Sequence, residues 1–205
     1  ITSTSEVYGT AQYVPMDENH PLVGQSPYSA SKIAADQISL SYFKSFSTPI
    51  KIIRPFNTYG PRQSLRAVVP TIISQYLSKS KKVNIGTINS KRDFTYVSDL
   101  CNAYYLILKS KNFFGEVHNI GSGKEISVGD IIKKVEKITS INKELNSKKN
   151  RKRPNESEVM RLLCNNKKIT KNYKWKPKVN FESGLTETIN WYKDLNKDYK
   201  NKYFI

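Results

Sequence analysis

Hydrophobic and polar positions alternate along the chain with periods that predict an alternation of strands and helices. The β-branched run at 1–5 predicts a strand that leads into a turn at Gly9. Apolar side chains then recur at steps of three and four residues, which predicts a helix over 28–47 that ends before Pro49. The stripe consists of Ile33, Ala34, Ile38, Tyr42 and Phe46. The apolar run at 50–54 predicts a buried strand, so the order strand, helix, strand indicates a crossover between parallel strands.

Beyond Pro61 the pattern predicts shorter elements. The predicted helices cover 67–78, 98–109, 127–139, 165–173 and 182–199, and the predicted strands cover 82–85, 94–97 and 116–120. Ser98 is expected to cap one helix, and Ser127 with Asp130 is expected to open another. The polar and basic stretch 140–155 is expected to form an exposed loop. These elements predict an α/β fold, with half of a doubly wound parallel sheet followed by a small mixed α/β domain.

Composition excludes several classes of protein. The chain has 205 residues and contains no apolar run near the ~20 residues that span a bilayer. Cys101 and Cys164 lie far apart, which fits neither a disulfide framework nor a metal site, so a reducing cytoplasmic location is expected. Cys101 is expected on the core face of its helix. A membrane protein, a secreted mini-protein and a zinc module are therefore disfavoured.

The net charge of +17 invites a nucleic-acid interpretation. Lysine and arginine are dispersed, however, apart from one dense cluster within 148–153. Because no nucleic-acid-binding motif accompanies this cluster, the charge favours a solvated basic surface with a pocket for an anionic small molecule. An anion-binding role for the cluster stays open.

Tyr28 and Lys32 lie four residues apart at the start of the predicted helix, and therefore on one face of it. A nearby ammonium group favours the phenolate form of a tyrosine, so such a pair can act as a base. Taken alone, the same spacing also fits an ordinary exposed pair.

Four further motifs flank this pair in a fixed order. They are STSEVYG at 3–9, RPFNTYGPR at 54–62, RDFTYVSD at 92–99 and NIGSG at 119–123. Together with the Tyr28–Lys32 pair, they resemble the extended short-chain dehydrogenase/reductases that act on nucleotide sugars, the NAD-dependent epimerase/dehydratase family. Within it, Thr-Ser-Glu at 4–6 looks like sugar-nucleotide 4,6-dehydratases such as GDP-mannose 4,6-dehydratase. The stretch at 153–159 and the ending at 175–192 are similar to the 4,6-dehydratases of the legionaminic-acid pathway.

The resemblance implies a dehydratase reaction that makes a 4-keto-6-deoxy sugar for surface polysaccharide or glycoconjugates. Tyr28 would take the proton of the sugar 4-hydroxyl, Lys32 would assist it, and Thr4 would hydrogen-bond the 4-oxygen. Glu6 would then remove the hydrogen on carbon 5 before water leaves. Ser5 stands where related enzymes often have Asp, and it would relay a proton through water unless Glu6 serves twice.

The resemblance also implies binding roles. Residues 1–62 would form the C-terminal part of the NAD(P)-binding Rossmann domain, and 63–205 would mainly bind the nucleotide sugar. NAD or NADP would contact Tyr28, Lys32 and Pro55. The substrate would contact Asn57, Arg62, Arg92, Arg153 and Glu158, while Arg62 and Arg66 also fit as surface cations.

A Rossmann domain binds the dinucleotide pyrophosphate at a glycine-rich turn after its first strand. No such turn precedes the predicted catalytic strand, so we expect the chain to be the C-terminal part of a longer protein. The resemblance also implies a homodimer that pairs through the helix bearing Tyr28. Three alternatives stay open: a nucleotide-sugar 4-epimerase, a UDP-glucuronate decarboxylase, and a truncated, non-catalytic sugar-nucleotide-binding fragment.

Overall fold

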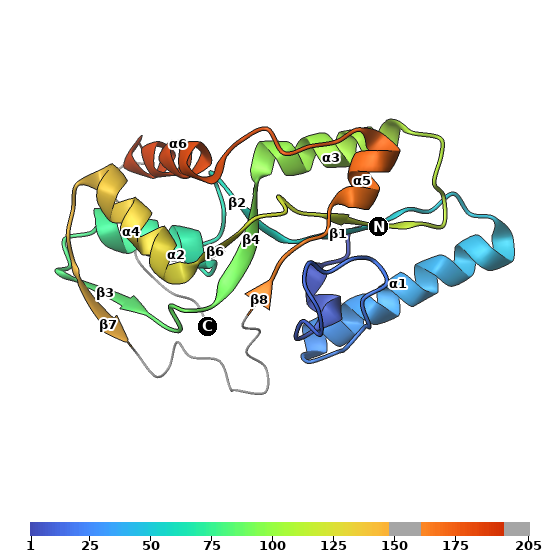
Figure 1. Cartoon of the computed structure of the whole chain (residues 1–205), viewed down its shortest axis with the longest axis horizontal. Helices are drawn as coiled ribbons and strands as arrows, with labels where there is room; N and C mark the ends of the chain where they lie inside the picture. The colour runs from blue at the N-terminus through green and yellow to red at the C-terminus, as the bar shows by residue number, and fades with distance from the viewer. Residues whose placement is uncertain (148–160, 195–205) are drawn as a thin grey trace.

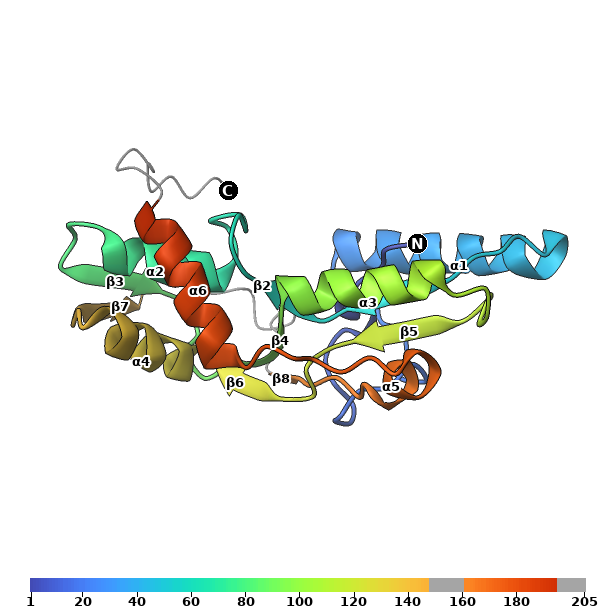
Figure 2. The ribbon, with the colours of Figure 1, turned by 90° about the horizontal axis from the view of Figure 1, so that it is seen from above.

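The computed structural model describes residues 1–147 and 161–194 as two lobes joined by strand β4 (Lys91–Tyr96) (Figure 1). Helices α1 (Pro27–Phe46), α3 (Val97–Lys109) and α5 (Lys167–Tyr173) belong to the first lobe. Helices α2 (Val68–Leu77), α4 (Val128–Thr139) and α6 (Phe181–Asp194) belong to the second. Figure 2, viewed from above, shows the same separation, with α1 and α3 both running along the first lobe.

The first lobe is built on a parallel pair of strands, β1 (Ile52–Pro55) and β5 (Val117–Ile120). Thr2 bridges Ile53 in parallel, so the chain start, α1 and β1 form the predicted crossover. The pairing of the predicted strand 1–5 extends little beyond this bridge, because the chain then turns into the 3₁₀ helix η1 (Ser5–Tyr8). Figure 1 shows α3 and α1 on opposite sides of β1.

The second lobe packs three helices against small sheets. Strand β4 pairs with β2 (Asn57–Tyr59) in parallel, with β6 (Glu125–Ser127) antiparallel, and with β8 (Arg161–Leu162) in parallel. Strands β3 (Lys82–Ile85) and β7 (Glu144–Ser147) form a separate parallel pair. Apolar residues of α2, α4 and α6 meet these strands in the largest core cluster.

The chain passes between the lobes more than once. After β4 it returns to the first lobe through α3 and β5, where Ala103, Ile107 and Ile120 pack with Ile53. It then crosses to α4 and comes back through α5. The domain division at residue 62 stays a prediction, and β5 lies beyond it although it pairs with β1.

Several expectations about local structure were wrong. Residues 144–147 form β7 within the stretch expected to be a loop, because β3 supplies a pairing partner. Ser98 lies inside α3 rather than capping it, since the N-cap is Tyr96. Cys101 is exposed because the buried face of α3 carries Asp99, Ala103 and Ile107.

The apolar stripe of α1 faces mostly outward. Ile38, Tyr42 and Phe46 are 60%, 53% and 72% exposed, whereas the buried positions of the helix are Ser29 and Asp36. Ile33 alone of the stripe packs against a core cluster. Among the residues described, no helix combines the length and apolar character needed to cross a bilayer.

Candidate active site

The segment Thr4–Glu6 lies at the end of the short extended start of the chain. Thr4 is the N-cap of η1, and its Oγ1 accepts a hydrogen bond of 3.2 Å from the Glu6 backbone N–H. This bond uses the threonine oxygen as an acceptor and leaves the O–H available to donate. Thr4 and Glu6 are half-buried, while Ser5 is buried. Thr4 and Glu6 are therefore the more accessible members of the three.

Tyr28 and Lys32 lie in the first turns of α1, and this helix packs against η1. The start of this helix is fixed by a capping box between Ser26 and Ser29, with Pro27 in the first turn. Lys32 Nζ donates a hydrogen bond of 3.1 Å to the Thr2 carbonyl, two residues before Thr4. The structure thus brings the helix of Tyr28 and Lys32 together with the segment of Thr4 and Glu6.

The same corner suits one end of a dinucleotide cofactor. An ammonium group has three N–H donors, and the bond to Thr2 uses only one of those on Lys32. Tyr28 is half exposed, so its hydroxyl can reach a bound molecule. Pro55 ends β1, opposite Ile120 in the register. The exposed Tyr28 hydroxyl and the remaining N–H donors of Lys32 are thus polar groups that could hold a ribose, while no hydrogen bond within the described residues joins Pro55 to either of them.

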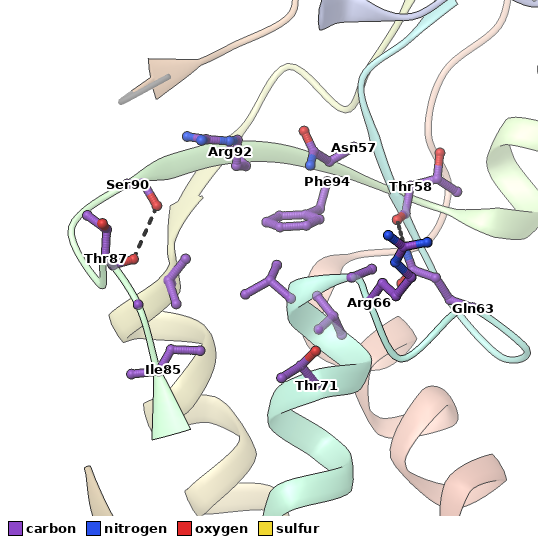
Figure 3. Close-up of a pocket in the computed structure, with 15 residues that line it drawn as sticks. Asn57, Thr58, Gln63, Arg66, Thr71, Ile85, Thr87, Ser90, Arg92 and Phe94 are labelled. Atoms are coloured by element: carbon purple, nitrogen blue, oxygen red, sulfur yellow. Dashed lines mark hydrogen bonds between the residues drawn. The ribbon is translucent and has the colours of Figure 1, made fainter. Parts of the chain in front are cut away.

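A separate pocket of about 260 Å³ lies in the second lobe between α2, β2 and β4. Asn57 on β2 pairs in register with Phe94 on β4, and Arg92 lies two residues earlier on the same face as Phe94. Figure 3 shows Asn57 and Arg92 on neighbouring strands near the Phe94 ring, with Arg66 and Gln63 beside β2. The pocket therefore combines a planar ring with two guanidinium groups, which suits a nucleotide and its phosphates.

The remaining predicted site residues are not brought into this pocket. Arg62 is exposed with a positive φ of 65° and does not line it. Arg153 and Glu158 lie outside the described residues. Arg66, for which a surface role was equally open, does line the pocket.

The sequence reasoning missed the β3–β4 loop as part of the pocket. Gly86, Thr87 and Ser90 line it, and Ser90 Oγ donates to the Thr87 carbonyl. A short polar stretch between two predicted strands was the available signal. Phe94 was not named as a site residue either; it lines the pocket and also belongs to the largest core cluster, with 6% of its surface exposed.

In Figure 1 the N-terminal end of α1, which carries Tyr28, points toward the second lobe. Asn57 follows β1 of the first lobe after one intervening residue, Phe56. The β1–β2 segment therefore runs from the first lobe directly into the strand that presents Asn57 to the pocket.

Comparison with known sequences gives a consistent result. The family model described as GDP-mannose 4,6 dehydratase matches residues 1–188. A putative UDP-glucose 4-epimerase of Methanocaldococcus jannaschii is 33% identical over 96% of this chain and 63% of its own length. The dTDP-D-glucose 4,6-dehydratase of Bos taurus is 34% identical over 97% of this chain and 56% of its own length.

Solved structures show the same fold. The dTDP-glucose 4,6-dehydratase of Bacillus anthracis, in complex with NAD, matches 94% of this chain and 60% of its own, with 32% identity and a TM-score of 0.85. The UDP-glucuronic acid 4-epimerase of Bacillus cereus, in complex with UDP-glucuronic acid and NAD, matches 95% and 60%, with 32% identity and a TM-score of 0.87. The chain spans less than two thirds of the length of these proteins.

Proposed function

Because the chain belongs to the GDP-mannose 4,6-dehydratase family, we propose that it supplies the catalytic groups and nucleotide pocket of an NAD(P)-dependent nucleotide-sugar 4,6-dehydratase. The product would be a 4-keto-6-deoxy sugar. The observation that carries this proposal is the packing of η1 against α1, the helix of Tyr28 and Lys32, together with the hydrogen bond from Lys32 to the Thr2 carbonyl.

Tyr28 acts first in this scheme. Tyr28 takes the proton from the sugar 4-hydroxyl, and Lys32, four residues later on the same helix, assists it. Thr4 donates its O–H to the same oxygen, which its capping geometry leaves free to do. When bound, NAD or NADP supplies the hydride exchange with the sugar.

Glu6 acts on the ketone formed at carbon 4. A 4-ketone makes the hydrogen on carbon 5 acidic; the half-buried Glu6 carboxylate removes that proton and passes it to the 6-hydroxyl, which leaves as water. Return of the hydride to carbon 6 and of a proton from water to carbon 5 would then complete the 6-deoxy sugar. Ser5 is buried in this chain, so a proton relay through Ser5 would need an intervening water. This role of Glu6 distinguishes dehydration from simple 4-epimerisation, which needs no base at carbon 5.

The nucleotide would occupy the pocket of the second lobe. Asn57 and the guanidinium groups of Arg92 and Arg66 would bind the diphosphate, and Phe94 would contact the nucleotide. Arg153 and Glu158 remain proposed contacts for the phosphates and the ribose.

Product mass tests this proposal. The whole protein, supplied with NAD⁺ or NADP⁺, is incubated separately with dTDP-glucose, GDP-mannose, UDP-N-acetylglucosamine and UDP-glucuronate, and the mass of each product is measured by mass spectrometry. Loss of one water from any of them supports dehydration. An unchanged mass with inverted carbon 4 would indicate epimerisation, loss of carbon dioxide from UDP-glucuronate would indicate decarboxylation, and binding without turnover would indicate a non-catalytic module.

A nucleotide-sugar 4-epimerase is the second candidate function. It is favoured by the two 4-epimerases among the similar proteins, one of which was solved with UDP-glucuronic acid bound. It would use Tyr28, Lys32 and Thr4 in the same way and leave Glu6 without a chemical role.

We also propose a homodimer in the cytoplasm that serves surface polysaccharide or glycoconjugate synthesis. The exposed Ile38, Tyr42 and Phe46 on α1 provide an apolar face for pairing. Cys101 and Cys164 are both free thiols, which fits a reducing compartment.

A further inference from the structure

A buried ion pair joins the helix of Tyr28 to the central strand of the first lobe. Asp36 on α1 accepts from Arg54 on β1 through two guanidinium nitrogens, with Nε at 3.0 Å and Nη2 at 2.9 Å from Oδ2. The two side chains are 0% and 3% exposed. Withdrawing two charges from water is costly, so such a pair is a weak source of net stability and needs another explanation.

This pair holds both ends of the segment that carries Thr4, Ser5 and Glu6. At the near end, Ser3 Oγ donates to Asp36 Oδ2 at 2.9 Å. At the far end, Arg54 Nη1 donates to the Tyr8 hydroxyl at 3.0 Å.

The far contact continues into β5. The Tyr8 hydroxyl donates to Asn119 Oδ1 at 2.7 Å. Burial raises the pKa of Tyr8 to about 12, so this hydroxyl keeps its proton and can act as donor and acceptor at once. Segment 3–8 is therefore tied to α1, β1 and β5 by fully buried hydrogen bonds.

We propose that Asp36, Arg54 and Tyr8 are positioning residues that fix the Thr4–Glu6 segment against α1. Their side chains are buried, so they act through the catalytic groups rather than on the sugar. Asp36 and Tyr28 belong to the same helix, so one network sets the placement of Glu6 relative to Tyr28. The inference rests on the proposed function, since it concerns the geometry of that site.

The test compares Tyr8→Phe with a matched control. Tyr76→Phe removes a hydroxyl from an equally buried tyrosine ring in the other lobe, where it donates to Glu136 at 2.7 Å. In the whole protein, Tyr8→Phe is expected to lower kcat by about tenfold or more, because displacement of reacting groups by about 1 Å can cost ~10²-fold. The KM for the nucleotide sugar should stay within about twofold, since the pocket of Asn57 and Arg92 lies in the other lobe.

Tyr76→Phe is expected to leave both constants within about twofold of the unmodified protein. An equal fall of kcat in the two variants, or a fall of kcat in neither, would overturn the positioning role. If Tyr8→Phe does not fold, Ser3→Ala takes its place, because it removes only the hydrogen bond to Asp36.

Hydrogen exchange provides a readout that does not need turnover. The amides of Val7 and Gly9 donate to the carbonyls of Thr4 and Glu6 within η1. They should exchange faster in Tyr8→Phe than in either the unmodified protein or Tyr76→Phe, and equal rates would overturn the proposal. If these amides exchange faster in Tyr8→Phe but the unmodified protein turns over no nucleotide sugar, the positioning of the Thr4–Glu6 segment is upheld and the proposed function is refuted.

Discussion

The buried carboxylate of Asp93 accepts hydrogen bonds from both the backbone N–H and the hydroxyl group of Ser122, at the turn that follows β5. The same carboxylate accepts from the backbone N–H groups of Gly123 and Cys164. One side chain of β4 therefore holds two other segments of the chain by hydrogen bonds, the turn at 122–123 and the backbone at Cys164. Its neighbour Arg92 lines the pocket, so this anchor also fixes the strand that presents Arg92.

Asp93→Ala is expected to destabilise the protein by about 3 kcal/mol, because it leaves the buried Cys164 N–H and the partly buried Ser122 and Gly123 N–H groups without an acceptor. The free energy of unfolding in urea measures this loss. The control is Asp130→Ala, which removes an exposed carboxylate at the start of α4 and should cost only ~1 kcal/mol. Similar losses of unfolding free energy in the two variants would show that the hydrogen bonds of Asp93 stabilise the fold no more than those of an exposed carboxylate.

Arg92→Ala is expected to weaken the binding of nucleoside diphosphates. A charge-assisted hydrogen bond contributes about 1.5–3 kcal/mol, so the Kd for UDP or GDP should rise by about 10- to 100-fold in titration calorimetry. Arg62→Ala removes the same charge outside the pocket and should leave the Kd within about twofold. Equal effects of both variants would mean that general basic charge, rather than the pocket, binds the diphosphate.

His118 gives the fold a defined acid sensitivity. It lies fully buried on β5, and burial, reinforced by the Lys168 charge, lowers its pKa from 6.5 to about 4. The unfolded chain then takes up a proton at this side chain more readily than the folded protein does. The contribution of His118 to the free energy of unfolding therefore falls as the pH drops from 6.5 toward 4. The urea midpoint should therefore fall less between about pH 7 and about pH 5 in His118→Gln than in the unmodified protein. An equal fall of the urea midpoint in His118→Gln and in the unmodified protein would refute this role of His118.

The outward face of α1 is the proposed dimer contact. Ile38→Glu places a charge in that face and should convert the dimer to a monomer in analytical ultracentrifugation, because an interface cannot bury an unpaired charge cheaply. Leu108→Glu makes the same kind of change on α3, where the leucine is 85% exposed, and should leave the protein a dimer in the same experiment. A dimer that survives Ile38→Glu would exclude this face.

Local signals in the sequence predicted the helices well. Helix α4 begins directly after Ser127, whose side chain accepts from the Asp130 N–H, and it ends at Thr139 as expected. Helix α1 lies within one residue of its predicted bounds, because the Ser26 cap and Pro49 limit it from both sides. These features act over a few residues, so a single segment contains them.

Local sequence patterns did not predict the features that depend on partners far away along the chain. Strand β7 is polar and exists as a strand through its pairing with β3, about 60 residues earlier. The inner face of α1 is polar at Asp36 because Arg54 supplies its partner, so the apolar stripe gave no guide to burial. Asn57 and Arg92 meet through the β2–β4 pairing, and only a family resemblance connected them in advance.

The most direct test of the dehydratase account is the replacement of Glu6 by Gln in the whole protein, which keeps the shape of the side chain and removes its basicity. We expect the variant to bind UDP or GDP as the unmodified protein does and to lose formation of the dehydrated product by about 10²-fold or more, as measured by mass spectrometry. Slow reduction of bound NAD⁺ should persist, because Tyr28 still takes the first proton. Dehydration at the unmodified rate in Glu6→Gln would contradict the account.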